Sequence, residues 1–180
     1  MVLVAAGIAA AGFLIIAVGV AVAAPKCKRS TKGISPEIVR LAKKWAAIRG
    51  IPVEWVLATI KIESGGDVCK VGKAGEIGLM QVYPKPNVAL LKELGVSAQG
   101  LFNADKNLKV GTALLKQRWE QVHAATGGSS SVPVGTLVAL AYWGPGPTLK
   151  AIREGTDPRL ENPQRVANWN AALQATAPLV

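Results

Sequence analysis

One long apolar run, residues 2–24, restricts how this chain can fold more than any other feature of its sequence. The run has no charged side chain, no amide side chain and no proline, so a helix formed from it has no polar face to turn toward water. At about 1.5 Å of helical rise per residue, such a run crosses a hydrocarbon core of roughly 30 Å. The sequence therefore predicts a single N-terminal transmembrane helix, residues 1–25, that anchors a separate domain.

A cleaved signal peptide is the alternative for this run, because residues 21–23 (AVA) offer the small side chains of a cleavage site. However, no lysine or arginine precedes the run, and the run is longer than the about 7–15 apolar residues of a signal core. A lipoprotein anchor at Cys27 fits less well, since the residues before it, APK, lack the small side chains that such sites need. We therefore favour the retained anchor.

The formal net charge of +10 is concentrated directly after the apolar run. Residues 26–49 contain a single acid, Glu37, and eight basic residues: Lys26, Lys28, Arg29, Lys32, Arg40, Lys43, Lys44 and Arg49. Cations beside a membrane helix bind anionic lipid headgroups, at about 1 kcal/mol each. No basic stripe with interleaved aromatic residues follows, so we expect no nucleic-acid partner. The expected partner is a lipid bilayer, contacted through residues 2–24 and the basic flank 26–32.

The remaining sequence predicts a mainly α-helical domain, residues 35–180, joined to the anchor by a basic linker over residues 26–34. Ser35, Pro36 and Glu37 have the residue types that begin a helix. Asp105 and Asn162 are expected to cap two later helices. Glycine and proline interrupt residues 65–86 and leave room for a short hairpin over residues 71–82. Helices are predicted over residues 36–49, 52–64, 87–94, 105–126, 134–143, 148–154 and 163–174.

Several chemistries are excluded by the residue types present. His123 is the single histidine, so no two-histidine metal site exists, and we expect neither a metal nor a cofactor. No glycine-rich phosphate loop is followed by the Lys-Ser/Thr pair of a nucleotide site. Cys27 and Cys69 can form at most one disulfide, and the sequence leaves open whether they are bonded or free.

Carboxylates remain as candidate catalytic groups, and Glu63 is the best placed. It shares a helix face with Val56 and Ile60, so an inward orientation would desolvate it. Desolvation raises the pKa of a carboxyl group, as a general acid near neutral pH requires. The alternative is an exposed glutamate at a helix C-terminus, where its charge opposes the helix dipole. The spacing alone does not decide between them.

Four segments carry a resemblance to a known family: residues 62–66 (IESGG), 75–84 (GEIGLMQVYP), 107–115 (NLKVGTALL) and 139–147 (ALAYWGPGP). In order and approximate spacing they resemble the lytic transglycosylases of the SLT type, which are related in fold to goose-type lysozymes. The resemblance covers residues 35–174. It implies a lysozyme-like helical domain that cleaves the β-1,4 bond between N-acetylmuramic acid and N-acetylglucosamine in peptidoglycan glycan strands, and that forms 1,6-anhydromuramic acid.

The resemblance also implies residue roles. Glu63 would be the catalytic acid and then the base, with the sugar's own N-acetyl group stabilising the developing charge. Ser64 would orient Glu63 or a neighbouring backbone group, and Asn107 and Gly111 would hold their helix against the core. Tyr142 would place its hydroxyl near Glu63, and Leu79 and Met80 would line the groove. The substrate-binding set is then Ser64, Leu79, Met80, Gln81, Tyr142 and Trp143.

Three departures from the family pattern matter. Trp143 stands where the family usually has asparagine, and it could stack on a sugar or fill core volume. Glu76 stands where a small residue is common. As a second carboxylate it could activate water and make the enzyme a muramidase, and Asp67 is a weaker candidate for the same role. The family's C-terminal tyrosine segment is not evident over residues 161–169. A third alternative is a peptidoglycan-binding or assembly module without activity, which the change at Trp143 supports.

The cellular setting raises a conflict. Peptidoglycan lies outside the cytoplasmic membrane, whereas positive charge only after the anchor favours a domain kept inside. A bacteriophage that acquires its membrane inside the cell and carries the enzyme in its virion would resolve the conflict, as would a secretion machine that opens the wall locally. We expect a single-pass protein of a virion membrane or of the bacterial inner membrane that acts on periplasmic murein, and we favour the virion.

Overall fold

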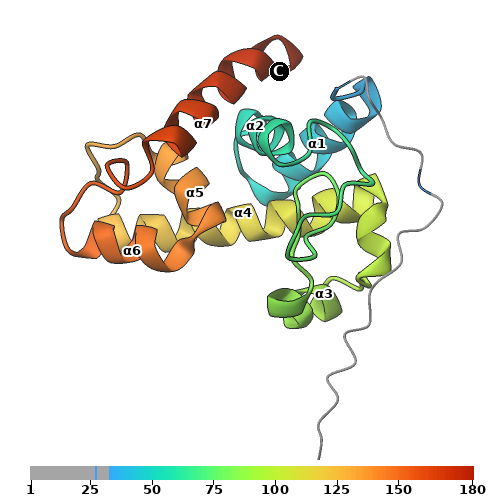
Figure 1. Ribbon diagram of the computed structural model, residues 1–180, viewed down its shortest axis with the longest axis horizontal. Helices are drawn as coiled ribbons and strands as arrows, with labels where there is room; N and C mark the ends of the chain where they lie inside the picture. Colours follow the sequence, from blue (N-terminus) through green and yellow to red (C-terminus); the bar gives the residue numbers. More distant parts are fainter. Residues whose placement is uncertain (1–26, 28–32) are drawn as a thin grey trace, which may run out of the picture.

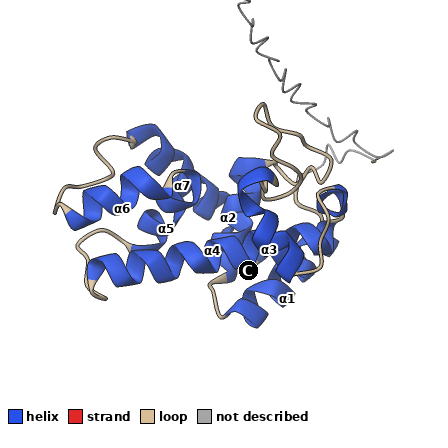
Figure 2. Cartoon of the chain, turned by 90° about the horizontal axis from the view of Figure 1, so that it is seen from below, coloured by secondary structure: helices blue, strands red, loops and turns tan. Residues whose placement is uncertain are grey.

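The computed structural model describes residue 27 and residues 33–180, and this part of the chain is helical, with two isolated β-bridges and no strand (Figures 1 and 2). The mainly α-helical fold class is therefore confirmed for the described residues. The predicted transmembrane helix, residues 1–25, lies outside them, as does most of the basic linker. Among the helices that are described, none is both long enough and apolar enough to cross a bilayer.

Each helix that the sequence predicts within residues 35–180 is present. Short 3₁₀ segments precede α3 and α4 and follow α7, at Lys85–Asn87, Gln99–Phe102 and Ala177–Leu179. The α-helices are α1 (Pro36–Arg49), α2 (Val53–Glu63), α3 (Val88–Glu93), α4 (Ala104–Thr126), α5 (Val134–Trp143), α6 (Pro145–Arg153) and α7 (Pro163–Thr176).

The first helix begins and ends as its sequence predicts. The Ser35 hydroxyl accepts a hydrogen bond from the Ile38 amide at 3.3 Å, and Gly50 ends α1 in the left-handed conformation with φ 61°. The predicted cap of α4 is wrong by two residues, because Asn103 accepts from the Lys106 amide at 3.1 Å. Asp105 instead accepts hydrogen bonds from Lys44 and Trp45, and so ties α4 to α1.

Two later boundaries also differ from the prediction. Residues 144–147 (GPGP) were expected to separate two helices, but α6 already begins at Pro145. Proline lacks an amide donor and has a helical φ, so it is well suited to a first helical turn. The last helix, α7, continues to Thr176, and the side chain of its N-cap residue, Asn162, makes no capping hydrogen bond.

The domain is organised around α4, which runs through it from end to end (Figure 1). Helices α1, α5 and α6 pack against α4, while α2 packs chiefly against α7. The main core includes Leu57 of α2, Leu115 of α4 and Leu137 of α5, all almost completely buried. A smaller cluster around Trp169, which is 1% exposed, joins α7 to α2 and α5. This packing brings the ends of α2, α5 and α7 to one place.

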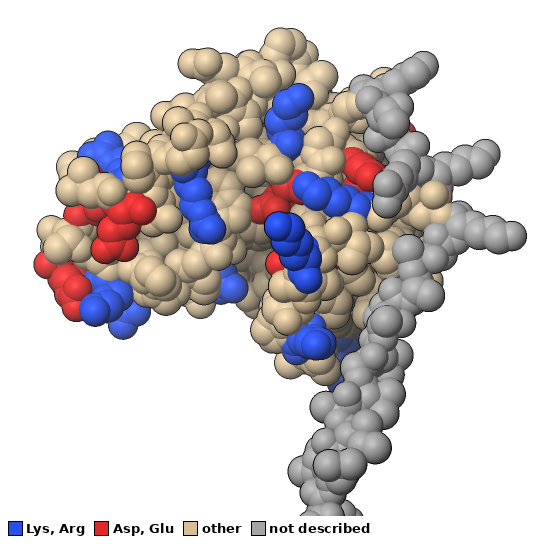
Figure 3. Space-filling model, in the orientation of Figure 1, with Lys and Arg blue, Asp and Glu red and all other residues tan. Residues whose placement is uncertain are grey.

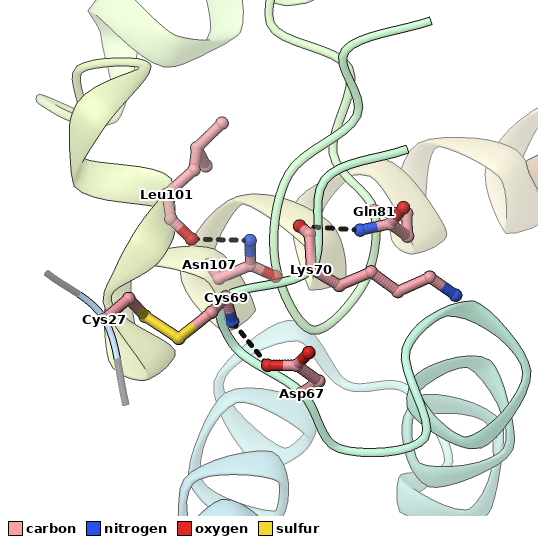
Figure 4. The surroundings of a disulfide bond; sticks show 7 residues. All are labelled: Cys27, Asp67, Cys69, Lys70, Gln81, Leu101 and Asn107. Atoms are coloured by element: carbon pink, nitrogen blue, oxygen red, sulfur yellow. Dashed lines mark hydrogen bonds between the residues drawn. A yellow bond between two sulfur atoms is a disulfide. The ribbon is translucent and has the colours of Figure 1, made fainter. Parts of the chain in front are cut away.

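A disulfide, which the sequence left open, joins Cys27 to Cys69, with Cα atoms 5.7 Å apart (Figure 4). The bond connects the segment before α1 to the loop after α2, across 42 residues of sequence. Asp67 supports the loop, because its carboxylate accepts a hydrogen bond from the Cys69 amide at 2.9 Å. The disulfide therefore fixes the loop that directly follows Glu63.

Candidate active site

Glu63 is the last residue of α2 and lies half-buried at the rim of the core. Val56 and Ile60, on the same face of the helix, are both 0% exposed, which confirms that this face points inward. Burial raises the pKa of Glu63 above its ordinary value, and the nearby charge of Glu76 adds to the rise. The predicted desolvation of this carboxyl group is thereby confirmed.

Three groups act in the opposite direction on the pKa of Glu63. The largest effect is a hydrogen bond from the Trp143 indole, and the positive charges of Lys70 and Arg165 also lower the pKa. Lys70 donates a hydrogen bond to the Glu63 backbone carbonyl from the loop that follows α2. Glu63 is therefore a carboxyl group whose protonated form is favoured by burial, while surrounding donors and cations still stabilise its charged form.

Trp143, at the end of α5, donates its indole N–H to Glu63 Oε1 at 2.5 Å. The Arg165 guanidinium of α7 lies over the indole ring, 5.5 Å from its centroid. Trp143 also packs partly against the cluster around Trp169, so the core-packing alternative holds in part. The bond to Glu63 is a role that the sequence did not indicate, and it leaves the second carboxyl oxygen, Oε2, without a bond to Trp143.

Tyr142 lies beside Trp143 and bonds to a different partner. Its hydroxyl donates to the Met80 backbone carbonyl at 2.9 Å. Burial raises the pKa of Tyr142 well above its ordinary range, and the charge of Glu63 adds to the rise. Tyr142 therefore stays a neutral hydroxyl that joins α5 to the loop opposite.

Asn107 of α4 holds that loop, residues 77–81, from beneath. Its buried amide donates to the Ile77 and Leu101 carbonyls at 2.8 Å and 2.9 Å, and its oxygen accepts from the Met80 amide at 2.9 Å. Gly111 leaves room for Met80, since an added Cβ would lie 2.4 Å from the Met80 sulfur. Asn107 and Gly111 therefore hold α4 against this buried loop, as predicted for their helix and the core.

Leu79 and Met80 do not line the groove with their side chains, which corrects the prediction made for them. Both are 0% exposed and pack in the main core. Gly78, with a φ of 77°, turns the backbone of this loop, and the hydrogen bonds from Asn107 hold it with its apolar side chains directed inward. Their contribution to the site is the position that they give to the next residue, Gln81.

Gln81 has a φ of 46°, in the left-handed region that non-glycine residues rarely occupy. Its side-chain amide donates to the Lys70 and Gly78 carbonyls at 3.2 Å and 2.9 Å, and Figure 4 shows the first of these bonds. With both amide hydrogens used, Oε1 is the atom that can accept a hydrogen bond from a ligand. Strained backbone of this kind is often found where a side chain is held for function.

The two candidate second carboxylates occupy different positions. Glu76 is half-buried, accepts from the Ala74 amide at 3.1 Å, and its charge affects Glu63. Its Oε2 lies against Gly72, where an added Cβ would approach to 2.2 Å. Asp67 instead accepts from the Cys69 amide and supports the loop. Of the two, Glu76 is therefore the carboxylate whose charge reaches Glu63.

Ser64 bonds to backbone groups beside Glu63. Its hydroxyl donates to the Ile60 carbonyl at 3.2 Å and accepts from the Gly66 amide at 3.1 Å, so it holds the turn that ends α2. This agrees with the predicted orientation of a neighbouring backbone group.

On the face of the molecule that Figure 3 shows, acidic side chains lie near the middle with basic side chains on both sides. Among the described residues, no group of three histidine, cysteine or acidic side chains could hold a metal.

The family model described as "Transglycosylase SLT domain" matches residues 40–161, more than half of the chain. The chain belongs to the transglycosylase SLT domain family. The matched range contains Glu63, the loop held by Asn107, and Trp143, so the SLT match covers most of the candidate site.

Two curated relatives of this SLT domain chain are each named "Endo-type membrane-bound lytic murein transglycosylase A", from two strains of Klebsiella pneumoniae. Each is 32% identical to the chain over 94 residues, which is 45% of this chain and 46% of the relative. The alignment therefore spans less than half the length of these relatives.

One charged residue of the site lies outside the SLT match. Arg165 belongs to α7, beyond residue 161, and no local pattern in the sequence marks it. Lys70 and the bond between Trp143 and Glu63 were also missed, because each depends on how α2, α5 and the following loop pack together. The basic residue seven positions after Glu63 was the one available signal, and it does not identify a contact by itself.

Proposed function

We propose that this chain is a peptidoglycan lytic transglycosylase in which Glu63 is the catalytic acid and base. The observation that carries the proposal is the environment of Glu63: a half-buried carboxyl group with a raised pKa, held on one oxygen by Trp143. Membership of the SLT family and the lytic murein transglycosylase relatives support the same activity. The substrate is the β-1,4 bond between N-acetylmuramic acid and N-acetylglucosamine.

The reaction proceeds in two steps that use one carboxyl group. Protonated Glu63 gives its proton to the glycosidic oxygen as the bond to the muramic anomeric carbon breaks, and the N-acetyl carbonyl oxygen of that sugar bonds to the carbon. Ionised Glu63 then takes the proton from the muramic 6-hydroxyl, whose oxygen displaces the acetamido oxygen and closes the 1,6-anhydro ring. Glu63 is again protonated, and no water is consumed.

The neighbouring groups supply binding and orientation in this proposal. Trp143 holds Oε1, so Oε2 is the oxygen that exchanges the proton with substrate. Gln81 Oε1 accepts a hydrogen bond from the acetamido N–H of a neighbouring sugar, because its amide hydrogens already bond to the backbone. Ser64 holds the turn that ends α2, and Tyr142 holds the loop over residues 77–81.

A muramidase is the second candidate, and the influence of the Glu76 charge on Glu63 favours it. In that case Glu76 activates water on the opposite side of the anomeric carbon, and the product has a reducing end. The third candidate, an inactive binding module, was supported by the change at Trp143. Because Trp143 bonds to the candidate acid, that change no longer argues for a lost active site.

Mass spectrometry of products from purified peptidoglycan tests the proposal. Anhydromuramic ends are expected from the wild type. Glu63→Gln should lower turnover by about 10²–10⁴-fold, the usual contribution of a general acid. This variant should keep its circular dichroism and a Tm at pH 7 at or above that of the wild type, since burial disfavours the charged carboxylate.

Glu76→Gln serves as the matched variant. If Glu63 acts alone, Glu76→Gln should still form anhydromuramic ends. If the wild type forms reducing ends and Glu76→Gln forms no product, the enzyme is a muramidase. Full activity of Glu63→Gln would contradict both enzymatic proposals.

We further propose that the domain acts outside the cytoplasm, anchored by residues 2–24. The disulfide supports this location, because structural disulfides form in oxidising compartments, and the named relatives are membrane-bound. The finer setting that we propose is a bacteriophage virion membrane, with a secretion machine in the inner membrane as the alternative. Detection of the protein in purified virions would support the virion membrane. Its absence from virions, together with its presence in cell envelopes, would support the secretion machine.

A further inference from the structure

A cavity of about 820 Å³ lies beside the candidate active site, between the loop after Cys69 and the segment that contains α3. Its apolar wall includes Ile77, Leu91 and Phe102, which belong to the main core. At the edge of this cavity, Val71 is 50% exposed and Val88 is 64% exposed. Apolar side chains left open around a concave surface are typical of a binding site.

The charged residues that line the cavity all have the same sign. They are Lys73, Lys85 and Lys92, each exposed, and no acidic residue from the described part of the chain lines the cavity. Figure 3 shows basic side chains on the lobe that α3 forms. A buried apolar wall with three cations around its opening favours a ligand that has small apolar groups and several carboxylates.

The cavity and the candidate active site share one wall. Gly72 and Ile77 line the cavity, and Gly72 lies directly against the Glu76 and Gln81 side chains on the other side of the loop. An added Cβ on Gly72 would lie 2.2 Å from Glu76 Oε2 and 2.9 Å from Gln81 Oε1. The backbone at Gly72 therefore lies between the cavity and the Gln81 side chain.

We propose that the cavity binds the acidic peptide stem of peptidoglycan, an inference that rests on the proposed function. The stem is attached to the lactyl group of the same muramic acid that the reaction cleaves. It carries free carboxylates, which suit the three lysines, and alanine methyl groups, which suit the apolar wall. The cavity volume is within the range of about 300–1,000 Å³ that is usual for small-ligand sites.

A lipid surface is the other anionic partner that lysines attract, and the shape of the site argues against it. A bilayer contacts a convex or flat surface and would reach only the exposed edge of this cavity, whereas its apolar wall of Ile77, Leu91 and Phe102 lies within the hollow. A single extended peptide can enter such a hollow and bring its carboxylates to the rim. The peptide therefore satisfies the charge and the concave apolar wall together.

Binding of the free stem tetrapeptide, measured by calorimetry, tests the proposal. Lys85→Ser/Lys92→Ser should weaken binding at least tenfold, and a tetrapeptide whose side-chain and terminal carboxylates are amidated should bind the wild type at least tenfold more weakly. The control is Lys116→Ser/Lys150→Ser, which removes the same charge from α4 and α6, outside the cavity. Equal binding by both double variants, or equal binding of the amidated peptide, would overturn the proposal.

A kinetic comparison separates this proposal from the proposed function. For each variant, kcat/KM is measured on intact peptidoglycan and on glycan strands stripped of their stems by an amidase. The preference for intact material should fall severalfold in Lys85→Ser/Lys92→Ser and persist in the control variant. If the wild type releases no product from either substrate, the proposed function is wrong. The calorimetric measurement of peptide binding then still tests whether the cavity binds the stem. If the cavity variant loses binding to anionic vesicles and retains the peptide, the occupant is a membrane and the proposal is wrong.

Discussion

At the scale of single residues, the proton on Glu63 is set by opposing effects. Burial and the charge of Glu76 raise its pKa, whereas the Trp143 bond and the charges of Lys70 and Arg165 lower it. Complete desolvation would keep the acid protonated and hinder its second task as a base. The surrounding donors therefore allow the same carboxyl group to release and recover a proton in one reaction.

Replacing Trp143 with phenylalanine tests this balance. Trp143→Phe keeps an aromatic ring and removes the N–H that stabilises the charged form, so the pKa of Glu63 should rise further. Since Glu63 must be protonated in the free enzyme, the alkaline limb of the kcat/KM profile should move to higher pH. The measurement is the pH profile of release of soluble product from peptidoglycan.

Trp45→Phe is the matched control for this experiment. Trp45 also donates its indole N–H to a carboxylate, Asp105, at 2.8 Å, and that pair joins α1 to α4 away from Glu63. Its loss should leave the pH profile in place even if the Tm falls. An unchanged profile in Trp143→Phe, or the same shift in both variants, would contradict the assigned role.

At the scale of elements, the joint between α4 and the loop over residues 77–81 positions Gln81. Gly111→Ala should disturb this joint, because the new Cβ would lie 2.4 Å from the Met80 sulfur and 2.7 Å from its Cβ. Overpacking of this kind costs about 1–3 kcal/mol, more than the helix propensity gained from alanine. We expect a lower Tm and a larger loss of activity than of folded protein, measured by calorimetry and product release.

Gly146→Ala provides the comparison within a helix. Gly146 lies in α6 with no atom within 4 Å of an added Cβ apart from its chain neighbours. The helix propensity gained from alanine is then opposed only by the crowding that Pro147 imposes on the residue before it, so the same substitution should lower the Tm less than Gly111→Ala does. Similar Tm values for the two alanine variants would show that Met80 can move at little cost and that the joint is less rigid than its contacts indicate.

At the scale of the whole molecule, the disulfide closes the chain around α1 and α2 and holds the loop beside Glu63. Replacing both cysteines with serine should reduce the free energy of unfolding by about 2–4 kcal/mol. For a domain of this size, that corresponds to a fall in Tm of roughly 5–15 °C. Thermal unfolding of the wild type and of the Cys27→Ser/Cys69→Ser variant measures the difference.

A reducing agent supplies the control for this prediction. It should lower the Tm of the wild type toward that of the double variant and leave the double variant unchanged. If neither the substitution nor reduction moves the Tm, the bond contributes no stability, and the argument from the disulfide to an oxidising compartment would lose its support.

The sequence by itself determined the helices and the candidate acid. Capping residues and apolar periodicity act within one or two helical turns, so the ends of α1 at Ser35 and Gly50 could be predicted locally. The spacing left the orientation of Glu63 open, and the family resemblance singled that residue out. The cap of α4 is an exception: Asn103 caps the helix, whereas Asp105 bonds to Lys44 and Trp45 of α1, a contact between distant residues that no local pattern contains. Asn107 and Gly111 could be assigned through the family resemblance, since their spacing is part of its pattern.

Only the tertiary structure decided which distant side chains meet at Glu63. Trp143 reaches it from 80 positions later, Arg165 reaches the Trp143 ring from α7, and Cys27 pairs with Cys69 across α1 and α2. The inward burial of Leu79 and Met80, and the cavity beyond the shared loop, likewise depend on packing between elements. Sequence spacing records contacts along one helix, whereas these contacts arise because apolar burial brings the ends of α2, α5 and α7 together.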